Sequence, residues 1–365
     1  MEGNLYTFSA IKGIQAGLPY FVVMIPLNLI PRIFVFDESD VPADMRAQRV
    51  LSKQRVPQIA KYITENLEEY TFSALCASVD ATLTFEGGDA NSGLGNVGKL
   101  SFPMSAQILL NDGQHRRAAI EEALKEKPEL GIETIAVVIF QDKGLGKSQQ
   151  MFVDLNKNAI KPSGSLNVLF DHRDPTSRIS NHLLEEISFF DRFIEREKTT
   201  LSNRTSKLYT LSALNSANKN MLRSHIGDEE KSLRIAKDFW TQATEKIPEW
   251  KRLSIDSVRS SELRQETILA HGVTLKALGR VAARILELDH TVSDFPHVLS
   301  KIGEIDWSKR NSKLWVGRAV NSGRINGSKK SERLIENQIL KEIGLAISED
   351  GEVLEREFIE AKHDY

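Results

Sequence analysis

The sequence predicts an α+β protein in which a mixed α/β domain is followed by a mainly helical domain. Up to about residue 165, short β-forming runs alternate with stretches of helical spacing, and from Leu166 onward amphipathic helical stretches dominate. A chain of 365 residues, 41% hydrophobic and 27% charged, also has the size and composition of a soluble protein with two domains. We therefore expect domains at residues 1–165 and 166–335, followed by an acidic C-terminal segment at 336–365.

The elements of the first domain are placed from residue type and spacing. Apolar residues at helical spacing predict a helix at 56–63, where Pro57 is tolerated in the first turn. Five glycines predict a surface loop at 87–98. Runs of β-forming residues predict strands at 20–25, at 32–36, within 71–85, at 106–111 and at 135–140.

The second domain is predicted from apolar residues that recur at helical spacing. They indicate helices at 179–193 and 233–247, and a long apolar helix at 267–285. The stretch 317–331 is polar and contains glycine, which indicates a loop.

The most informative stretch is Asp-Gly-Gln-His-Arg-Arg, residues 112–117. It follows the predicted strand at 106–111 and leads into a helical pattern, so the order is strand, tight turn, helix. Backbone N–H groups at a helix start are unpaired and carry partial positive charge, and His115, Arg116 and Arg117 add to it. The run therefore predicts a site for phosphate, either of a nucleotide or of a nucleic-acid backbone.

A purely structural interpretation of the same run stays open. Asp112 is a favoured helix cap and Gly113 suits a turn. Arg116 would then pair with a carboxylate of the core.

The charge is unevenly distributed near the C-terminus. The net charge of -2 argues against indiscriminate nucleic-acid binding, but eight basic residues lie between Lys309 and Arg333, opposed only by Glu332. The stretch 342–364 is mainly acidic. This order predicts a polyanion-binding surface that the acidic segment shields, or two solvated helix faces that neutralise each other. Trp307 and Trp315 flank part of the basic run, as nucleic-acid contacts or as core residues.

Other features limit the class of protein. The single cysteine, Cys76, excludes an internal disulfide and a cysteine-based zinc site, fits a reducing cytoplasm, and is interpreted as a small buried residue. The apolar run at 20–25 is too short to cross a bilayer, and the first residues lack a signal-peptide pattern. We expect a soluble cytoplasmic protein.

The run Asp-Gly-Gln-His-Arg resembles the motif of the DGQHR-domain family, which is related to the ParB/sulfiredoxin superfamily. The stretches 48–49, 54–63 and 152–159 are similar to an Arg-bearing helix and an Asn-containing element of that family. Their order, together with Lys-Leu-Tyr-Thr-Leu-Ser-Ala-Leu at 207–214, resembles the DndB branch, regulatory proteins of bacterial DNA phosphorothioate modification. The resemblance covers most of the chain. It implies a ParB/sulfiredoxin-like first domain and a DNA-binding repressor of the modification genes.

The resemblance also implies roles within the motif. Gly113 would allow close approach of the backbone, and Gln114, His115 and Arg116 would face the phosphates of a bound nucleotide. If the protein is a nucleotide hydrolase that uses ATP with Mg²⁺, Asp112 and His115 become candidate catalytic residues. The sequence shows no clear set of Mg²⁺-binding carboxylates near the motif and no Gly-x-x-x-x-Gly-Lys-Ser/Thr loop.

The expected DNA contacts are basic or amide-bearing residues from both domains. For the later ones, a solvated face or a turn is an equally good interpretation. They are Arg49, Arg55, Arg116, Arg117, Asn156, Lys157, Asn158, Arg204, Lys207, Lys309, Arg310 and Lys313.

Three functions follow from these observations. The first is a repressor that binds double-stranded promoter DNA as a homo-oligomer. The second is a ParB-like nucleotide hydrolase with DNA-nicking activity. The third is a module that recruits the modification enzymes through its helical domain. No helix-turn-helix is evident.

Overall fold

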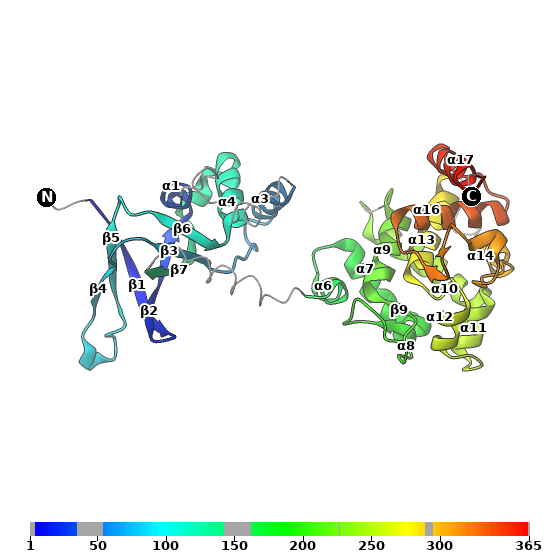
Figure 1. Ribbon diagram of the computed structural model, residues 1–365, viewed down its shortest axis with the longest axis horizontal. Helices are drawn as coiled ribbons and strands as arrows, with labels where there is room; N and C mark the ends of the chain where they lie inside the picture. Colours follow the sequence, from blue (N-terminus) through cyan, green and yellow to red (C-terminus); the bar gives the residue numbers. More distant parts are fainter. Residues whose placement is uncertain (1–3, 35–53, 142–161, 226, 289–294, 364–365) are drawn as a thin grey trace. The chain divides into compact units, whose positions relative to one another are not determined.

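The computed structural model describes residues 4–34, 54–141, 162–225, 227–288 and 295–363. The chain divides into two compact units, Met1–Ile160 and Lys161–Tyr365, which we describe separately. The first is built on a mixed β-sheet and the second is almost entirely helical (Figure 1), so the predicted α+β class is confirmed.

The first unit contains a seven-stranded sheet of order β4-β5-β1-β2-β7-β3-β6. Neighbouring strands are antiparallel except β3 and β7, which are parallel. The strands are β1 (Leu5–Gln15), β2 (Leu18–Pro26), β3 (Leu75–Val79), β4 (Thr84–Gly87), β5 (Val97–Pro103), β6 (Ile108–Asp112) and β7 (Thr134–Gln141). The helices are α1 (Ile30–Ile33), α3 (Arg55–Glu65) and α4 (Gln114–Glu126), with short 3-10 turns at Leu27–Leu29, Ala90–Ser92 and Pro128–Ile132.

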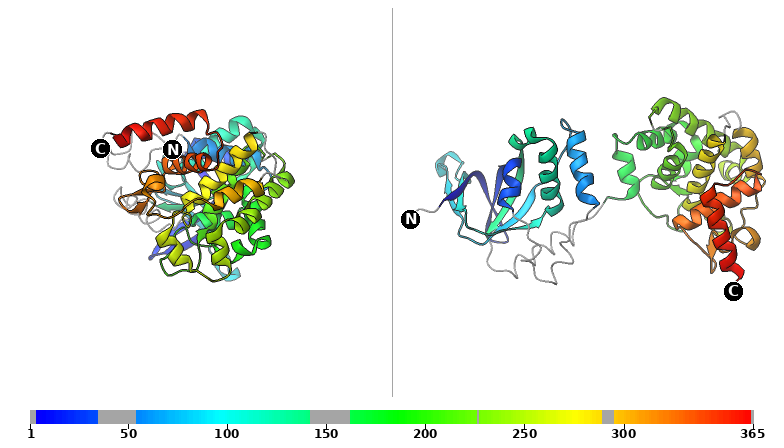
Figure 2. Two further views of the ribbon diagram at one scale, coloured as in Figure 1. Left: turned by 90° about the vertical axis from the view of Figure 1, so that its right-hand side faces the viewer. Right: turned by 90° about the horizontal axis from the view of Figure 1, so that it is seen from above.

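The core of the first unit lies between its helices and one face of the sheet (Figure 2). Val23 of β2 and Val137 of β7 are buried in the same hydrophobic cluster as Ala119 and Ile120 of α4. Strand β6 leads directly into α4, so the turn between them lies at one end of the sheet. This connection places the 112–117 run.

The structure confirms most of the elements predicted for the first domain, with one correction. The residues predicted as a strand at 32–36 begin inside α1, because Pro31 occupies its first turn, where proline is favoured. Ile33 and Phe34 are buried in the core. Residues 35 and 36 lie outside the described ranges.

The second unit consists of helices with two short pairs of strands. The helices are α6 (Gly164–Phe170), α7 (Pro175–Glu186), α8 (Ser188–Phe193), α9 (Leu211–Leu222), α10 (Glu229–Lys246), α11 (Pro248–Ser254), α12 (Ser260–Glu266), α13 (Gly272–Glu287), α14 (Phe295–Gly303), α15 (Ser312–Trp315), α16 (Lys329–Glu342) and α17 (Glu349–His363). The strand pairs are β8 (Ile194–Glu195) with β9 (Tyr209–Thr210), and β10 (Val320–Asn321) with β11 (Arg324–Ile325).

The core of the second unit is rich in aromatic side chains. Trp240 and Trp250 are fully buried, and the rings of Trp307 and Trp315 stack with their centroids 5.4 Å apart. The last two tryptophans are therefore core residues. None of the described helices is long and apolar enough to cross a membrane.

Three features of the second unit differ from the prediction. The stretch at 179–193 is divided between α7 and α8, because Ile187 between them has an extended backbone. The long apolar helix begins at Gly272, not at residue 267, because Thr267 forms a β-bridge with Ser308 and the N–H of Ile268 donates to the carbonyl of Trp307. The predicted loop at 317–331 contains the β10–β11 hairpin and the start of α16.

Helix α17 packs on α16 as part of the second unit. Arg318 and Glu355 form a bidentate ion pair whose side chains are only 9% and 5% exposed. The ammonium of Lys341 lies 2.6 Å from the same carboxylate. The acidic helix is therefore attached through buried charges.

Candidate functional site

The turn between β6 and α4 requires glycine. Gly113 has φ 108° and ψ 14°, in the left-handed region, and a Cβ there would lie 2.3 Å from Cδ2 of Leu75. Gly113 is the N-cap residue and no side chain caps the helix. The alternative role of Asp112 as a cap is therefore wrong, because its carboxylate accepts a hydrogen bond from Arg116 instead.

The guanidinium of Arg116 bonds to groups of the protein itself. Nη2 lies 2.5 Å from Oδ2 of Asp112. Nη1 donates to the carbonyls of Ser73 and Ala74, at 2.6 and 3.1 Å, and to the Ser73 hydroxyl. Only 15% of the Arg116 side chain is exposed. It joins α4 to the chain entering β3, and its carboxylate partner belongs to the motif.

Arg117 is held in a similar way on the other side of α4. Nε donates to the carbonyl of Phe34 at 2.8 Å and Nη2 donates to that of Pro31 at 3.1 Å. Nη1 pairs with Glu121 at 2.6 Å. Arg117 therefore joins α4 to the chain that leaves α1.

The remaining polar side chains of the turn are Gln114 and His115. The amide of Gln114 donates to the carbonyl of Leu110 at 3.1 Å. Burial lowers the pKa of His115, and the nearby charge of Arg55 lowers it further. Both effects favour the neutral imidazole of His115 over its cation at the start of α4.

Cys76 lies beside the end of β6, paired in register with Asp112. It is buried, as predicted for a small core residue, and burial raises the pKa of its thiol to about 11. Its neighbour Asn111 donates from its side-chain amide to the Ser78 hydroxyl at 2.7 Å. A thiol with this pKa is a poor nucleophile at neutral pH.

Several predicted contacts cannot be placed. Arg49, Asn156, Lys157 and Asn158 lie outside the described residues. Of the two earlier basic residues of the second unit, Arg204 is exposed, whereas Lys207 donates to the carbonyls of Asp191 and Arg192, at 3.3 and 2.8 Å.

Residues 309–333, which we call the basic segment, are held on the core by the stacked Trp307 and Trp315. Two of its eight basic residues point inward: Lys309 donates to the carbonyl of Arg264, and Arg318 pairs with Glu355. Five others are exposed and one is half-buried. These six are Arg310, Lys313, Arg324, Lys329, Lys330 and Arg333.

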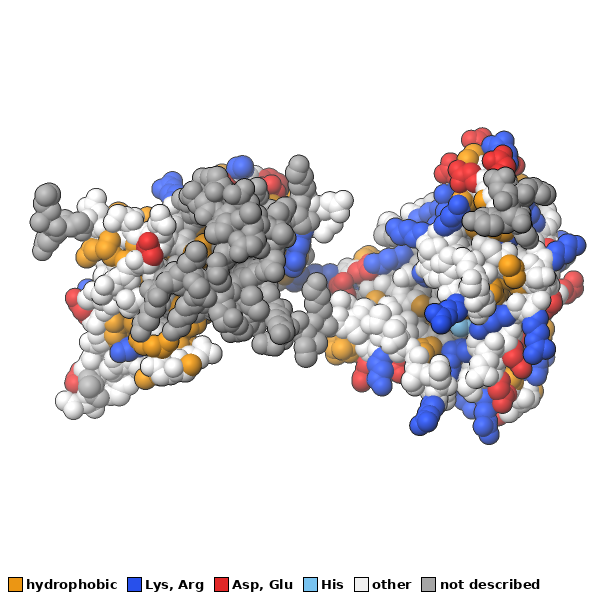
Figure 3. All heavy atoms as spheres, viewed as in Figure 1, with side chains coloured by type: hydrophobic (Ala, Val, Ile, Leu, Met, Phe, Trp, Pro, Cys, Tyr) orange, Lys and Arg blue, Asp and Glu red, His pale blue; other side chains and the backbone are white. Residues whose placement is uncertain are grey.

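The acidic helix α17 lies against part of the basic segment. Lys330 is 4.0 Å from Glu357, and Arg333 is 3.8 Å from Asp350. The visible face of the second unit carries Lys and Arg interspersed with Asp and Glu (Figure 3), without one continuous basic patch. Across the described residues, no three or more His, Cys, Asp or Glu side chains form a group that could hold a metal ion.

Residues 8–346 match the family DndB, described as DNA-sulfur modification-associated. No curated protein and no solved structure shows significant similarity to the chain.

Proposed function

The chain belongs to the DndB family of DNA-sulfur modification-associated proteins, and from this premise we propose that it is a DNA-binding repressor of the phosphorothioate modification genes. The observation that supports DNA binding best is that four cations of the basic segment are exposed, namely Arg310, Lys313, Arg324 and Lys329. Within the described ranges, none of the four forms an ion pair with a carboxylate.

Exposed cations of this kind suit contact with a DNA backbone. Cations without a protein partner lose little on meeting a phosphate and release counterions from the DNA. The stacked tryptophans beneath fix the segment, so less conformational entropy is lost on binding. Phosphate contacts position a protein on DNA but do not read its sequence. Base recognition is therefore assigned to other residues.

Acidic residues of helix α17 partly neutralise the edge of this surface. Glu357 and Asp350 face Lys330 and Arg333 at the edge of the basic segment. Their side chains are 60% and 88% exposed, so the pairs are weak and DNA phosphates can replace them. These acidic residues would reduce the affinity for unrelated DNA, while a specific DNA site would still bind.

The test is fluorescence anisotropy with a duplex from upstream of the modification genes, at several salt concentrations. Four phosphate contacts predict a slope of log affinity against log salt of about −3.6, at about −0.9 per contact. Replacing both Arg310 and Lys313 by Gln should reduce the steepness by about 1.8. The control replaces Arg192 and Lys237 by Gln, since each is paired with a carboxylate elsewhere on the unit. Equal slopes for the two double variants would contradict the proposed surface.

The same assay with an unrelated duplex tests the recruiting-module alternative, which predicts equal affinity for the upstream and the unrelated duplex. A dyad-symmetric promoter also predicts a homo-oligomer on the DNA. Sedimentation of the complex would measure its stoichiometry.

The nucleotide-hydrolase alternative rests on the Gly113 turn at the start of α4. The described residues do not fit Mg²⁺-ATP there. Arg116 and Arg117 already bond to carboxylates and carbonyls, and the described residues contain no group of metal-binding side chains. If a nucleotide nevertheless binds at this turn, its affinity should fall in His115→Ala.

A further inference from the structure

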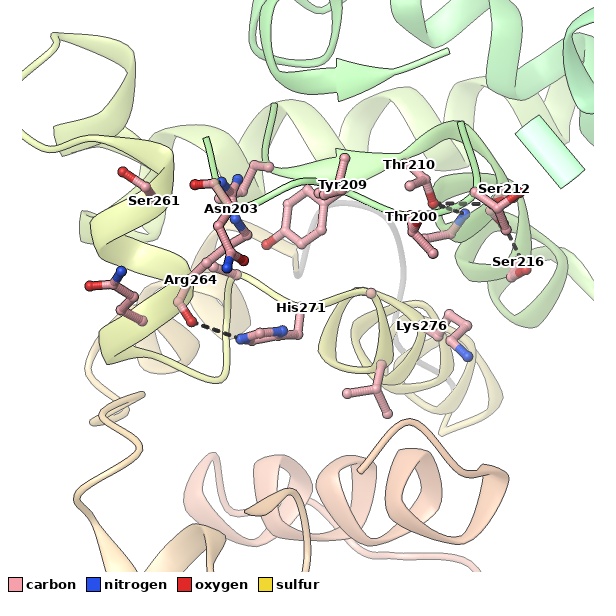
Figure 4. A pocket seen from close by; sticks show the side chains of 18 residues that line it. Thr200, Asn203, Tyr209, Thr210, Ser212, Ser216, Ser261, Arg264, His271 and Lys276 are labelled. Carbon is pink, nitrogen blue, oxygen red and sulfur yellow. Dashed lines mark hydrogen bonds between the residues drawn. The ribbon is translucent and has the colours of Figure 1, made fainter. Parts of the chain in front are cut away.

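The second unit contains a cavity of about 540 Å³ that the basic segment and the 112–117 run do not account for. It lies at the starts of α9 and α13, beside the end of α12. In Figure 4, the hydroxyl groups of Thr210, Ser212 and Ser216 lie along one wall, with His271 and Lys276 along the opposite one. Much of the 207–214 run lines it.

The cavity is electropositive because two helices begin at it in parallel. A Cβ on Gly272 would lie 3.1 Å from Cβ of Ala213, and one on Gly279 would lie 2.1 Å from the carbonyl oxygen of Ala217. The earlier glycine of α13 lies beside the earlier residue of α9, and the later glycine beside the later residue. The two closely packed helices therefore run parallel. Their positive ends lie side by side, which is unfavourable until an anion neutralises them.

The start of α13 leaves hydrogen-bond donors available. Thr210 caps α9 with its side chain, whereas His271, the N-cap residue of α13, makes no side-chain cap. Among the described residues, the N–H groups of Gly272 and Val273 make no hydrogen bond, and both residues line the cavity. Two adjacent backbone donors at a helix start are a common way to bind an oxyanion.

Three cations lie near this helix start, and two of them, Arg264 and Lys309, have no carboxylate partner among the described residues. The Arg264 guanidinium donates to carbonyls of 202–207, and the Arg264 carbonyl accepts from Lys309 and lies 3.0 Å from Nε2 of His271. Burial is the only influence on the pKa of either group, with no contribution from a carboxylate. Lys276 lies 3.3 Å from Glu332. Burial lowers the pKa of Arg264 and Lys309, as expected for cations withdrawn from water.

We propose that this cavity binds a small phosphorylated ligand of about mononucleotide size. The phosphoryl group would accept hydrogen bonds from the start of α13, with Lys276 and the Ser212 and Ser216 hydroxyls completing its surroundings. Leu201 and Val273 provide apolar wall for the rest of the ligand. The volume is typical of small-molecule sites and exceeds the needs of a bare phosphate ion. Because the DNA surface involves other residues, this proposal stands apart from the repressor function.

The test is calorimetric titration of the full chain with inorganic phosphate, AMP and ATP. At least one nucleotide should bind saturably and more tightly than phosphate. Lys276→Gln should weaken that binding about tenfold, because one charge-assisted hydrogen bond is lost. The matched control is Lys237→Gln, in which an exposed helical lysine paired with Glu186 is changed, and it should bind like the wild type.

A second variant keeps the proposal testable if Lys276→Gln impairs folding. Ser216→Leu fills the cavity and costs one hydrogen bond, from the Ser216 hydroxyl to the carbonyl of Ser212. It should abolish nucleotide binding while circular dichroism and tryptophan emission stay unchanged. Absence of saturable binding by the wild type, or equal affinity in the Lys276 and Lys237 variants, would overturn the proposal.

A competition arm identifies the source of the phosphate. If the ligand is a free nucleotide, saturating upstream duplex should leave its affinity unchanged. Displacement by the duplex would instead show that the cavity receives a DNA phosphate and would overturn the small-ligand assignment. Nucleotide binding lost in His115→Ala but retained in Lys276→Gln would also overturn it, by locating the site at the turn before α4.

Discussion

Replacing Arg116 by Ala should destabilise the first unit, because this side chain joins α4 to the chain entering β3. The change removes charge-assisted hydrogen bonds to the carbonyls of Ser73 and Ala74 and an ion pair with the half-exposed Asp112. Hydrogen bonds to charged groups contribute about 1.5–3 kcal/mol and an exposed ion pair less than about 1 kcal/mol. We therefore expect a loss of about 3 kcal/mol in the free energy of unfolding of that unit.

The positions of the tryptophans allow this loss to be assigned. All four lie in the second unit, so their fluorescence follows that unit alone, whereas circular dichroism follows both. At a urea dependence of about 2 kcal/mol/M, the first unit should unfold about 1.5 M earlier in Arg116→Ala. The fluorescence transition should not move.

Arg116→Lys serves as the control, since it keeps the charge but cannot reach all of these partners. It should retain part of the stability. If Arg116→Ala leaves both transitions in place and weakens DNA binding, Arg116 contacts phosphate and does not stabilise the first unit.

Three further predictions concern stability. Glu355→Ala should lower the free energy of unfolding of the second unit by about 3–5 kcal/mol, because Arg318 is left buried without its carboxylate; an unchanged fluorescence midpoint would refute this. Gly113→Ala should cost about 2 kcal/mol or more in the first unit, from left-handed strain and the clash with Leu75, measured by dichroism in urea. Burial lowers the pKa of His271 to about 4, so between pH 6.5 and 4 the unfolded state binds more protons than the folded state. The free energy of unfolding should therefore fall by about 3 kcal/mol as the pH is lowered through that interval. His271→Gln should flatten this dependence of stability on pH, and the same dependence in the variant and the wild type would contradict the assignment.

The sequence predicts local features where one local principle decides the structure. Gly113 was expected at a turn and has the left-handed φ that such a turn needs. The regular apolar spacing at 56–63 predicts α3 correctly. At 32–36 the β-forming residues predict a strand wrongly, because Pro31 and the burial of Ile33 favour a helical turn.

Local sequence patterns do not predict features that depend on contacts between residues far apart in the chain. The start of α13 is set by the bridge from Thr267 to Ser308, which no local spacing reveals. The pairing of Arg318 with Glu355 joins residues 37 apart and attaches the acidic helix to the second unit. The cavity is lined by the starts of α9 and α13, by α12 and by residues within 199–203, which are far apart in the sequence. Residues of the 207–214 run line this cavity, and no local pattern of the run indicates that they do.

The most direct test of the repressor account is the transcript level of the modification genes in cells that lack this chain. The account predicts that the level rises on deletion and returns when the wild-type chain is supplied. The variant with Gln in place of Arg310 and Lys313 should restore repression only partly, and the Arg192 and Lys237 control should restore it fully. A transcript level that does not change on deletion would contradict the account.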